Sequence, residues 1–267
     1  MSTGLQERTI ADFGEQWTAY DDHAGYFGSA ALFDDIFAPF VATADLTGCR
    51  VAEIGAGAGR FVNVMAAAGA AHVVALEPSA ACDVLGRQTA RYADRVTCLP
   101  LTGDRLPPSG DLDYVFAIGV LHHIPEPAPV VAAALAALRP GGRMAIWLYG
   151  REGNGLYLLV ARSLWGLSRR LPHRGLVALV WGIYPWLWAY MQSSRVLPLP
   201  LGHYMRRVIL PLAPDKRRLV VYDQLNPAYA RYYTRTEARH LLEAAGFADV
   251  RLHHRHGYSW TVVGTKP

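Results

Sequence analysis

The sequence has few charged residues, few cysteines and no signal-peptide pattern in its first residues. Each of these features excludes some classes of protein. Charged residues make up only 18% of the 267 residues and hydrophobic residues 52%, so the chain can bury a sizeable core and some of its surface is expected to meet an apolar partner. The three cysteines, Cys49, Cys82 and Cys98, are scattered without CxxC spacing, which predicts reduced structural thiols. The first residues, MSTGLQERTIADF, lack the basic start and apolar centre of a signal peptide, which predicts a cytoplasmic protein.

The net charge of +4 conceals an asymmetry between the two halves of the chain. Residues 1–150 hold 9 Lys and Arg against 16 Asp and Glu, a balance of −7, whereas residues 151–267 hold 17 against 6, a balance of +11. Two halves of opposite charge are expected to perform different tasks.

The N-terminal half alternates short apolar runs with Ala-rich helical stretches. The runs fall at 49–54, 72–76, 96–100, 113–118 and 144–149, and the helical stretch VVAAALAALRPGG closes with Pro140, Gly141 and Gly142 as a helix stop. This alternation predicts a parallel sheet that helices cover on both faces. In such a sheet a ligand binds beyond the carboxyl ends of the strands.

A glycine loop, GAGAG, follows the first of these strands. Glycines at 55, 57 and 59 let backbone amides approach a ligand closely. A phosphate loop of the GxxxxGK[ST] type is excluded, because Arg60 and Phe61 follow the last glycine. A dinucleotide fingerprint needs glycine at position 60, so NAD fits only weakly.

The ordered motifs around this loop resemble those of the class I S-adenosylmethionine-dependent methyltransferases. Glu53 stands before the glycines, and Glu77 ends the next strand 18 residues after Gly59, where a carboxylate can accept bonds from ribose hydroxyls. TGDRLPP (102–108), DYVFAIGVLHHIPEP and LRPGGRMAIWLY are similar to later motifs of small-molecule members, including the "LHH" turn of enzymes of ubiquinone and menaquinone biosynthesis.

The resemblance implies a fold, a cofactor and a set of cofactor contacts. The fold is α/β, a Rossmann-like, doubly wound, mostly parallel seven-stranded sheet, and the cofactor is S-adenosyl-L-methionine. Asp104 would bind the adenine amino group with Arg105 beside it, and FGEQWTAYDDHAGYF (13–27) is similar to a cap whose aromatic pair lies over the cofactor. The implied contacts are Trp17, Tyr20, Glu53, Gly55, Gly57, Gly59, Glu77, Pro78, Asp104, Arg105, Ile118 and Gly119.

His122 and His123 follow the fourth strand, where the transferred methyl group should lie. Either histidine is a candidate general base near neutral pH, and the alternative is an imidazole that only bonds a backbone carbonyl. A second histidine group, HHRH (253–256), lacks cysteine or carboxylate partners at ligand spacing, so no metal site is predicted there.

The C-terminal half holds an insertion at 150–233. Residues 234–267 resemble the final helix and hairpin of the family, with Thr234 as N-cap and Glu237 completing a capping box. The predicted organisation is therefore an N-terminal cap (1–48), a cofactor-binding core (49–149), a helical lid inserted after the fifth strand (150–233) and the completion of the core (234–267).

The lid is both apolar and basic. LVALVWGIYPWLWAYM (176–191) carries no charge, but it is shorter than a spanning helix and contains Pro185, which disfavours transmembrane insertion. Two interpretations stay open. The lid lines a hydrophobic pocket, or it lies on an anionic membrane surface with Arg169, Arg170, Arg174 and Arg195 at its flanks.

Tyrosines near the end of the lid are candidates for substrate contacts. Tyr229, Tyr232 and Tyr233 fall at i, i+3 and i+4, which predicts one face of a helix. Together with Tyr149 at the end of the fifth strand and Tyr222 beside Asp223, they are expected to rim the pocket. The substrate-binding candidates are Tyr149, Tyr222, Tyr229 and Tyr233.

The predicted function is methyl transfer from S-adenosylmethionine to a lipophilic small molecule of natural product biosynthesis, such as a polyketide, quinone or prenyl-bearing metabolite. The basic lid also admits an anionic group on that substrate. Two alternatives remain: a cofactor-dependent cyclase or isomerase on the same fold, and a non-catalytic sensor whose lid binds a membrane or a partner. Nucleic acid is not expected as a partner, because the basic residues are interleaved with apolar ones. A homodimer and peripheral membrane contact are both compatible with the sequence.

Overall fold

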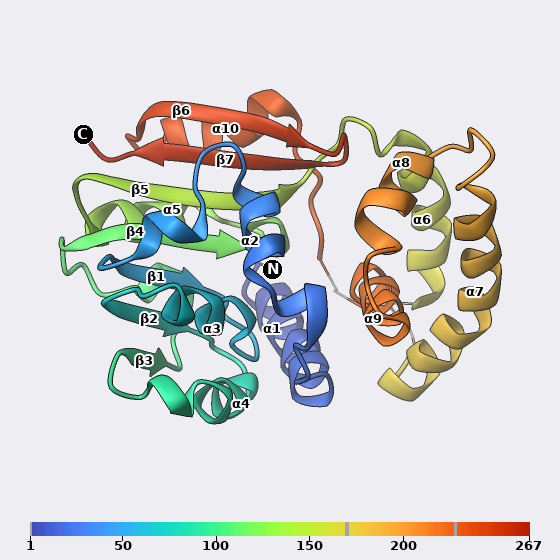
Figure 1. Cartoon of the computed structure of the whole chain (residues 1–267), viewed down its shortest axis with the longest axis horizontal. Coiled ribbons are helices and arrows are strands. Elements are labelled where there is room, and N and C mark those ends of the chain that lie inside the picture. Colours follow the sequence, from blue (N-terminus) through green and yellow to red (C-terminus); the bar gives the residue numbers. More distant parts are fainter. Residues whose placement is uncertain (1, 169–170, 227–228) are drawn as a thin grey trace.

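The centre of the molecule is a seven-stranded sheet in the order β3-β2-β1-β4-β5-β7-β6 (Figure 1). The computed structural model describes residues 2–168, 171–226 and 229–267. The strands are β1 (Arg50–Ile54), β2 (His72–Leu76), β3 (Val96–Leu99), β4 (Leu112–Ile118), β5 (Leu138–Tyr149), β6 (Ala248–Arg255) and β7 (Ser259–Thr265). Strands β1 to β5 pair in parallel, and β7 runs antiparallel to both β5 and β6. This topology confirms the predicted Rossmann-like, mostly parallel fold.

The two central strands are buried on both faces, which explains their continuous apolar sequences. Four of the five residues of β1 and six of the seven of β4 are buried. The predicted strand positions agree with the structure except at β5, which begins at Leu138 and not after the PGG turn. Pro140, Gly141 and Gly142 therefore lie within β5, and the preceding helix α5 (Ala128–Ala137) ends before them.

Helices pack on both faces of the sheet. On one face α5 and α10 (Arg235–Glu243) contribute buried side chains to a cluster with β1, β4, β5 and β7. On the other face α2 (Ala30–Phe37), α3 (Arg60–Ala67) and α4 (Ala81–Gln88) form a second cluster with the same sheet. Helix α10 begins with the predicted capping box, because Thr234 and Glu237 bond reciprocally.

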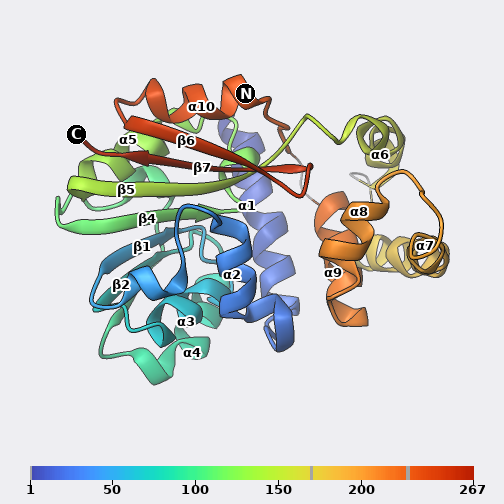
Figure 2. The same ribbon diagram turned by 45° about the horizontal axis from the view of Figure 1, so that its top comes forward.

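A helical lid stands beyond the carboxyl edge of the parallel strands. Its helices are α6 (Gly155–Ser168), α7 (His173–Ser193), α8 (Gly202–Tyr204) and α9 (Pro214–Leu225), with a π-helical turn at Met205–Ile209. Helix α1 (Ser2–Ala19) lies between the sheet and α9 in both views (Figures 1 and 2). The lid leaves and rejoins the core at one point, where Gly150 and Tyr233 form an isolated parallel bridge.

The lid carries all the large hydrophobic side chains that are exposed in the described part of the chain. They are Leu156, Leu159, Trp181, Trp186, Trp188, Val196 and Leu197. None of the helices within residues 2–168, 171–226 and 229–267 has the length and hydrophobicity that crossing a membrane requires. Pro185 lies inside α7.

Candidate active site

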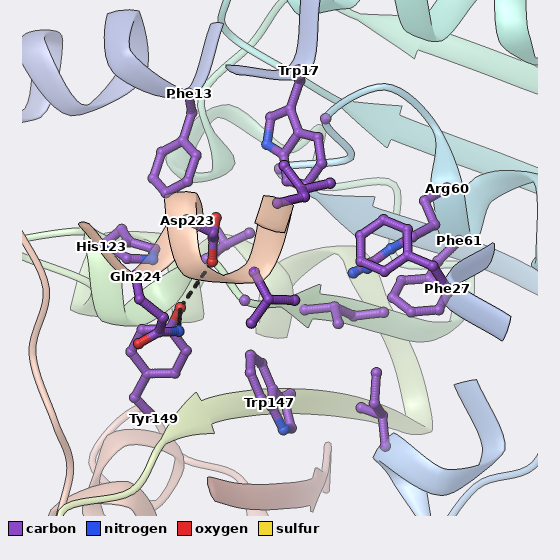
Figure 3. A pocket seen from close by; sticks show the side chains of 18 of the residues that line it. Phe13, Trp17, Phe27, Arg60, Phe61, His123, Trp147, Tyr149, Asp223 and Gln224 are labelled. Atoms are coloured by element: carbon purple, nitrogen blue, oxygen red, sulfur yellow. Dashed lines mark hydrogen bonds between the residues drawn. The ribbon is translucent and has the colours of Figure 1, made fainter. Parts of the chain in front are cut away.

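A cavity of about 480 Å³ lies where the carboxyl ends of β1, β4 and β5 meet α1 and the lid (Figure 3). Its walls are mostly apolar and aromatic, and they include Phe13, Phe27 and Trp147. Residues of the lid, among them Asp223 and Gln224 of α9, close the side opposite the sheet. The cavity therefore has the location that ligands take in open parallel sheets.

The glycine loop between β1 and α3 forms one wall of the cavity. Gly55 has φ +68°, and a Cβ there would come within 2.5 Å of Val120. Gly57 has φ +55°, and a Cβ there would lie 3.3 Å from the indole of Trp17. Both positions thus require glycine for backbone conformation and for close approach. Gly59, with φ +87°, is the N-cap of α3 and does not line the cavity.

The three acidic residues implied by the resemblance all line the cavity. Glu53 is buried, burial raises its pKa to about 8, and its Oε2 has no hydrogen-bond partner among the described residues. Glu77 accepts hydrogen bonds from the backbone amides of Gly57 (2.9 Å) and Ser79 (3.0 Å). Asp104 lies in a short 3₁₀ turn and is exposed. The three carboxyl groups are therefore brought together from separate strand ends.

The remaining predicted cofactor contacts divide into two groups. Trp17, Pro78, Ile118 and Gly119 line the cavity. Tyr20 does not, because α1 ends at Ala19 and the Tyr20 ring packs against Tyr222, with 5.7 Å between ring centroids. Arg105 is exposed and also lies outside the cavity lining. Of the expected aromatic pair, Trp17 and Tyr20, only Trp17 lines the cavity.

The two histidines of the LHH turn have different environments. His123 lines the cavity, and its Nδ1 lies 2.8 Å from the backbone oxygen of Tyr229. His122 is fully buried outside the cavity lining, and its ring stacks on Tyr149 at 3.8 Å. Neither ring nitrogen of His122 has a hydrogen-bond partner in the described structure, and burial holds its pKa well below the usual value.

The prediction that three tyrosines near the end of the lid share a helix face is wrong. The segment 229–232 is not helical, so Tyr229, Tyr232 and Tyr233 do not share a helix face. Tyr233 is instead held in extended backbone, because its amide donates to the carbonyl of Tyr149 and its carbonyl accepts from the amide of Arg151. Of the four substrate candidates only Tyr149 lines the cavity.

The other three candidates lie elsewhere, whereas Tyr232, which was not a candidate, lines the cavity. Tyr222 and Tyr233 are buried in separate hydrophobic clusters, and Tyr229 contributes its backbone oxygen to His123. Tyr232, in contrast, is part of the cavity wall, and its ring lies 5.2 Å from that of Tyr149.

Asp223 of α9 is the polar centre of the cavity, and sequence reasoning did not assign it a role. Its carboxylate accepts hydrogen bonds from Gln16 Nε2 (2.9 Å) and from Tyr149 Oη (3.1 Å), and the second bond is drawn in Figure 3. Gln224 Nε2 in turn donates to Tyr149 Oη (3.0 Å). The charge pattern could have pointed to Asp223. Residues 151–233 hold twelve Lys and Arg but only three Asp and Glu, and Asp223 is one of these three.

The remaining predictions concern the second histidine group and the arginines of the lid. His254 stacks on Trp260 at 4.2 Å, while His256 lies in the turn after β6 and faces Asp35. No cluster of metal-ligating side chains occurs within the described ranges. Arg174 and Arg195 are exposed, and Arg169 and Arg170 lie outside the described residues.

Comparison with known proteins places the core in a recognised family. The family described as "Methyltransferase domain" matches residues 52–144. Curated relatives include a tRNA U34 carboxymethyltransferase of Pseudoalteromonas translucida (strain TAC 125), 32% identical over 128 residues, and one of Hahella chejuensis, 36% identical over 104 residues. These matches cover 47% and 38% of this chain but only 40% and 32% of the relatives, so the chain spans well under half of their length.

Solved structures resemble the chain along its whole length. The 1,6-didemethyltoxoflavin-N1-methyltransferase of Burkholderia thailandensis, solved with S-adenosylhomocysteine, has a TM-score of 0.57 and 17% identity and covers 100% of this chain and 90% of its own. The magnesium protoporphyrin IX methyltransferase of Synechocystis PCC 6803, also with S-adenosylhomocysteine, has the same TM-score and identity and covers 100% and 99%. At this identity the likeness concerns the fold.

Three findings point to the same family. They are the strand order, the cavity lined by the glycine loop and three carboxyl groups, and the match of the core to a methyltransferase domain. Residues 52–144 are thus a methyltransferase domain, in a chain that has the fold of the class I S-adenosylmethionine-dependent methyltransferases.

Proposed function

We propose that the protein transfers a methyl group from S-adenosylmethionine to a lipophilic small molecule enclosed between the core and the lid. The observation that carries this proposal is the cavity of about 480 Å³, whose walls are mainly apolar and aromatic and whose outer side is a helical lid. A volume in this range suits a small molecule or cofactor. Polyketides, quinones and prenyl-bearing metabolites are the substrate classes that this lining favours.

The residues around the glycine loop suit the cofactor. The loop backbone is open toward the cavity at Gly55 and Gly57, with Trp17 lying over Gly57. Glu53 offers a buried carboxyl oxygen that has no partner among the described residues, and Glu77 keeps lone pairs for ribose hydroxyls. We assign the cofactor to Trp17, Glu53, Gly55, Gly57, Glu77, Pro78, Asp104, Ile118 and Gly119. When bound there, S-adenosylmethionine supplies the reactive methyl carbon.

His123 is assigned as the general base. A carbonyl oxygen only accepts hydrogen bonds, so the contact with Tyr229 requires a hydrogen on Nδ1 and leaves the lone pair on Nε2. Burial lowers the pKa of His123, so the imidazole is neutral at pH 7 and can remove a proton from a hydroxyl or an acidic C–H. His122 lies outside the cavity lining and does not meet the geometric requirement.

Asp223 and Tyr149 are assigned to positioning the substrate. Burial and the nearby Asp223 keep the pKa of Tyr149 well above its usual value, so its phenol stays protonated and donates to the carboxylate. Gln224 links this pair to Tyr157, which donates to Gln224 Oε1 at 2.7 Å. A polar network in an apolar cavity fixes the orientation of a bound molecule, while the lid excludes water.

Transfer to tRNA is a second candidate, because curated relatives that match nearly half of the chain are named tRNA U34 carboxymethyltransferases. The chain also has a basic segment, because residues 151–233 hold 12 Lys and Arg against 3 Asp and Glu. A tRNA substrate requires a salt-dependent surface contact, whereas a small molecule does not.

Labelled S-adenosylmethionine separates the candidates. The protein is incubated with a panel of phenols, quinones and polyketide-like acids and, in parallel, with total tRNA, and the label and product masses are followed. We expect label in an extractable small molecule whose mass has increased by one methyl group. Label in tRNA would replace the small-molecule assignment. Rearranged product without label would indicate a cyclase, and cofactor binding without any product would indicate a sensor.

A further inference from the structure

Arg60 is held rigidly at the wall of the cavity, although the proposed chemistry makes no use of it. It is the first residue of α3, directly after the glycine loop. Its guanidinium carbon lies 4.2 Å from the ring centroid of Phe27 and 4.1 Å from that of Phe61, so two aromatic rings pack against the cation (Figure 3). This stacking fixes the position of the charge and leaves the edge of the guanidinium for hydrogen bonds.

The charge of Arg60 has no anion to balance it within ion-pair distance in the described structure. No carboxylate of residues 2–168, 171–226 and 229–267 lies within 4.0 Å of its nitrogens, and none of its nitrogens forms a hydrogen bond there. Glu53 is near, but burial raises its pKa to about 8, so it is largely protonated at neutral pH. Burial lowers the pKa of Arg60 to about 10, and the side chain therefore remains charged.

A second polar group near Arg60 also has no partner. The His23 ring lies 6.5 Å from Phe27, and its buried Nε2 forms no hydrogen bond in the described structure. Lys216, 5.9 Å from the Phe27 centroid, is already paired with Asp22 and Asp215. Asp223 of the lid, whose charge also acts on Arg60, already accepts hydrogen bonds from Gln16 and Tyr149. This corner thus holds the charge of Arg60. It also holds the imidazole of His23, which burial keeps neutral by lowering its pKa to about 4 and which can donate from Nε2 in the tautomer that carries its hydrogen there.

The position of Arg60 indicates from which side its ligand comes. Phe27, which covers the guanidinium, packs with Leu212 and Leu219 of the lid in one hydrophobic cluster. The predicted cofactor carboxylates Glu77 and Asp104 lie instead after β2 and β3. Arg60 therefore faces the part of the cavity that the lid closes, where the acceptor molecule would be enclosed.

We propose that Arg60 binds an anionic group, a carboxylate or a phosphate, of the acceptor substrate, with His23 as a second donor. The inference rests on the proposed function in taking the molecule under the lid as the methyl acceptor. It narrows the substrate class to lipophilic acids. A planar guanidinium matches a carboxylate or a phosphate with two parallel hydrogen bonds, and in an enclosed apolar cavity such a pair discriminates strongly against neutral analogues.

Binding of matched probes tests the proposal without turnover. The probes are 2-naphthoate and its neutral analogue 2-naphthamide, titrated by calorimetry into the protein saturated with S-adenosylhomocysteine. We expect the wild type to prefer the carboxylate at least tenfold. Arg60→Met should abolish the preference and Arg60→Lys should retain part of it. Arg91→Met is the control, because Arg91 also stacks on an aromatic ring, 4.8 Å from Tyr92, but lies outside the cavity lining.

Two results of this titration would overturn the proposal. One is a wild type that shows no preference for 2-naphthoate, and the other is a preference that survives in Arg60→Met. A further titration tests whether Arg60 binds the carboxylate of the cofactor instead. The affinities of S-adenosylmethionine and of its decarboxylated form are measured, and we expect the ratio of the two to be the same in the wild type and in Arg60→Met. If the ratio collapses in that variant, Arg60 binds the carboxylate of the cofactor and the proposal is wrong. The binding preference is measured without turnover, so it does not depend on whether methyl transfer is detected. The proposed methyl transfer and the proposed role of Arg60 can therefore be refuted independently.

Discussion

At the scale of single residues, one hydrogen bond distinguishes the environments of two adjacent histidines, His122 and His123. His123 lines the cavity and has its Nδ1 against the carbonyl of Tyr229, whereas the His122 ring is enclosed beside Tyr149. The motif places both side chains after the same strand, so their sequence positions are equivalent. The distinction depends on a carbonyl 106 residues away, which local spacing does not predict.

The base assignment predicts a specific pH profile. His123→Gln should lower kcat by roughly 10²- to 10⁴-fold while the affinity for S-adenosylmethionine stays unchanged. In the wild type kcat should rise with pH and level off, because the neutral imidazole is the active form and burial places its pKa below 6.5. The acidic limb should disappear in His123→Gln and persist in His122→Gln. Steady-state rates between pH 5 and pH 8 check this, and an unchanged acidic limb in His123→Gln would refute the assignment.

Residues at the ends of strands or shortly after them could be placed from the sequence, and residues of the lid could not. Glu53, Glu77 and Asp104 line the cavity because parallel strands end at one edge of the sheet. Asp223 reaches the same cavity only because α9 packs across it, and that packing has no counterpart in local sequence pattern. In the sequence, Arg60 only excludes a phosphate loop and weakens the dinucleotide interpretation.

At the scale of secondary structure elements, hydrogen bonds to the core, and not helical residue spacing, determine the conformation of residues 229–233. The tyrosines at 229, 232 and 233 have helical spacing, but the backbone of Tyr233 pairs with β5 and its continuation at Arg151. A strand-like bridge fixes extended backbone, so the segment enters α10 without a helical turn. The capping box of α10, in contrast, depends on residues three apart and was predicted correctly.

The β1–α3 loop allows a controlled test of the cofactor site. Gly55→Ala places a Cβ at positive φ and within 2.5 Å of Val120, so the loop must move and S-adenosylmethionine binding should fall at least tenfold. Gly48→Ala is the matched control, because Gly48 has φ +74° but open space around it. Both variants should lose roughly 1–2 kcal/mol of stability through the left-handed backbone. Calorimetric titration measures the difference, and equal loss of binding in both would contradict a local role for the loop.

At the scale of the whole molecule, apolar exposure is concentrated on one side. All seven exposed large hydrophobic side chains of the described residues belong to 156–197, and the exposed positions of α7 from Ala178 to Ala189 carry no charge. Arg174 and Arg195 are exposed at the two ends of this stretch. Tryptophan rings flanked by arginines suit the boundary of an anionic membrane, where indole and guanidinium groups both have favourable partners.

We therefore predict that the lid binds anionic vesicles. Wild-type protein should co-sediment with vesicles of phosphatidylcholine and phosphatidylglycerol more than with phosphatidylcholine alone, and high salt should weaken the binding. Replacing Trp181, Trp186 and Trp188 together by Ser should abolish it, while thermal melting and S-adenosylmethionine binding serve as controls for folding. Should sedimentation instead reveal a dimer that the triple variant dissolves, with no vesicle binding, the face is occupied by a second copy of the chain.

The bridge between Gly150 and Tyr233 brings the two ends of the lid together at the edge of the core. The 82 residues between these two positions leave and return at adjacent backbone groups, so their length imposes no strain on the sheet. Strands β5 and β7, helix α10 and the glycine loop would keep their pairing with a different lid in this place. If the lid encloses the substrate, as proposed, replacing this one contiguous module would change substrate choice without altering the pairing of the core strands.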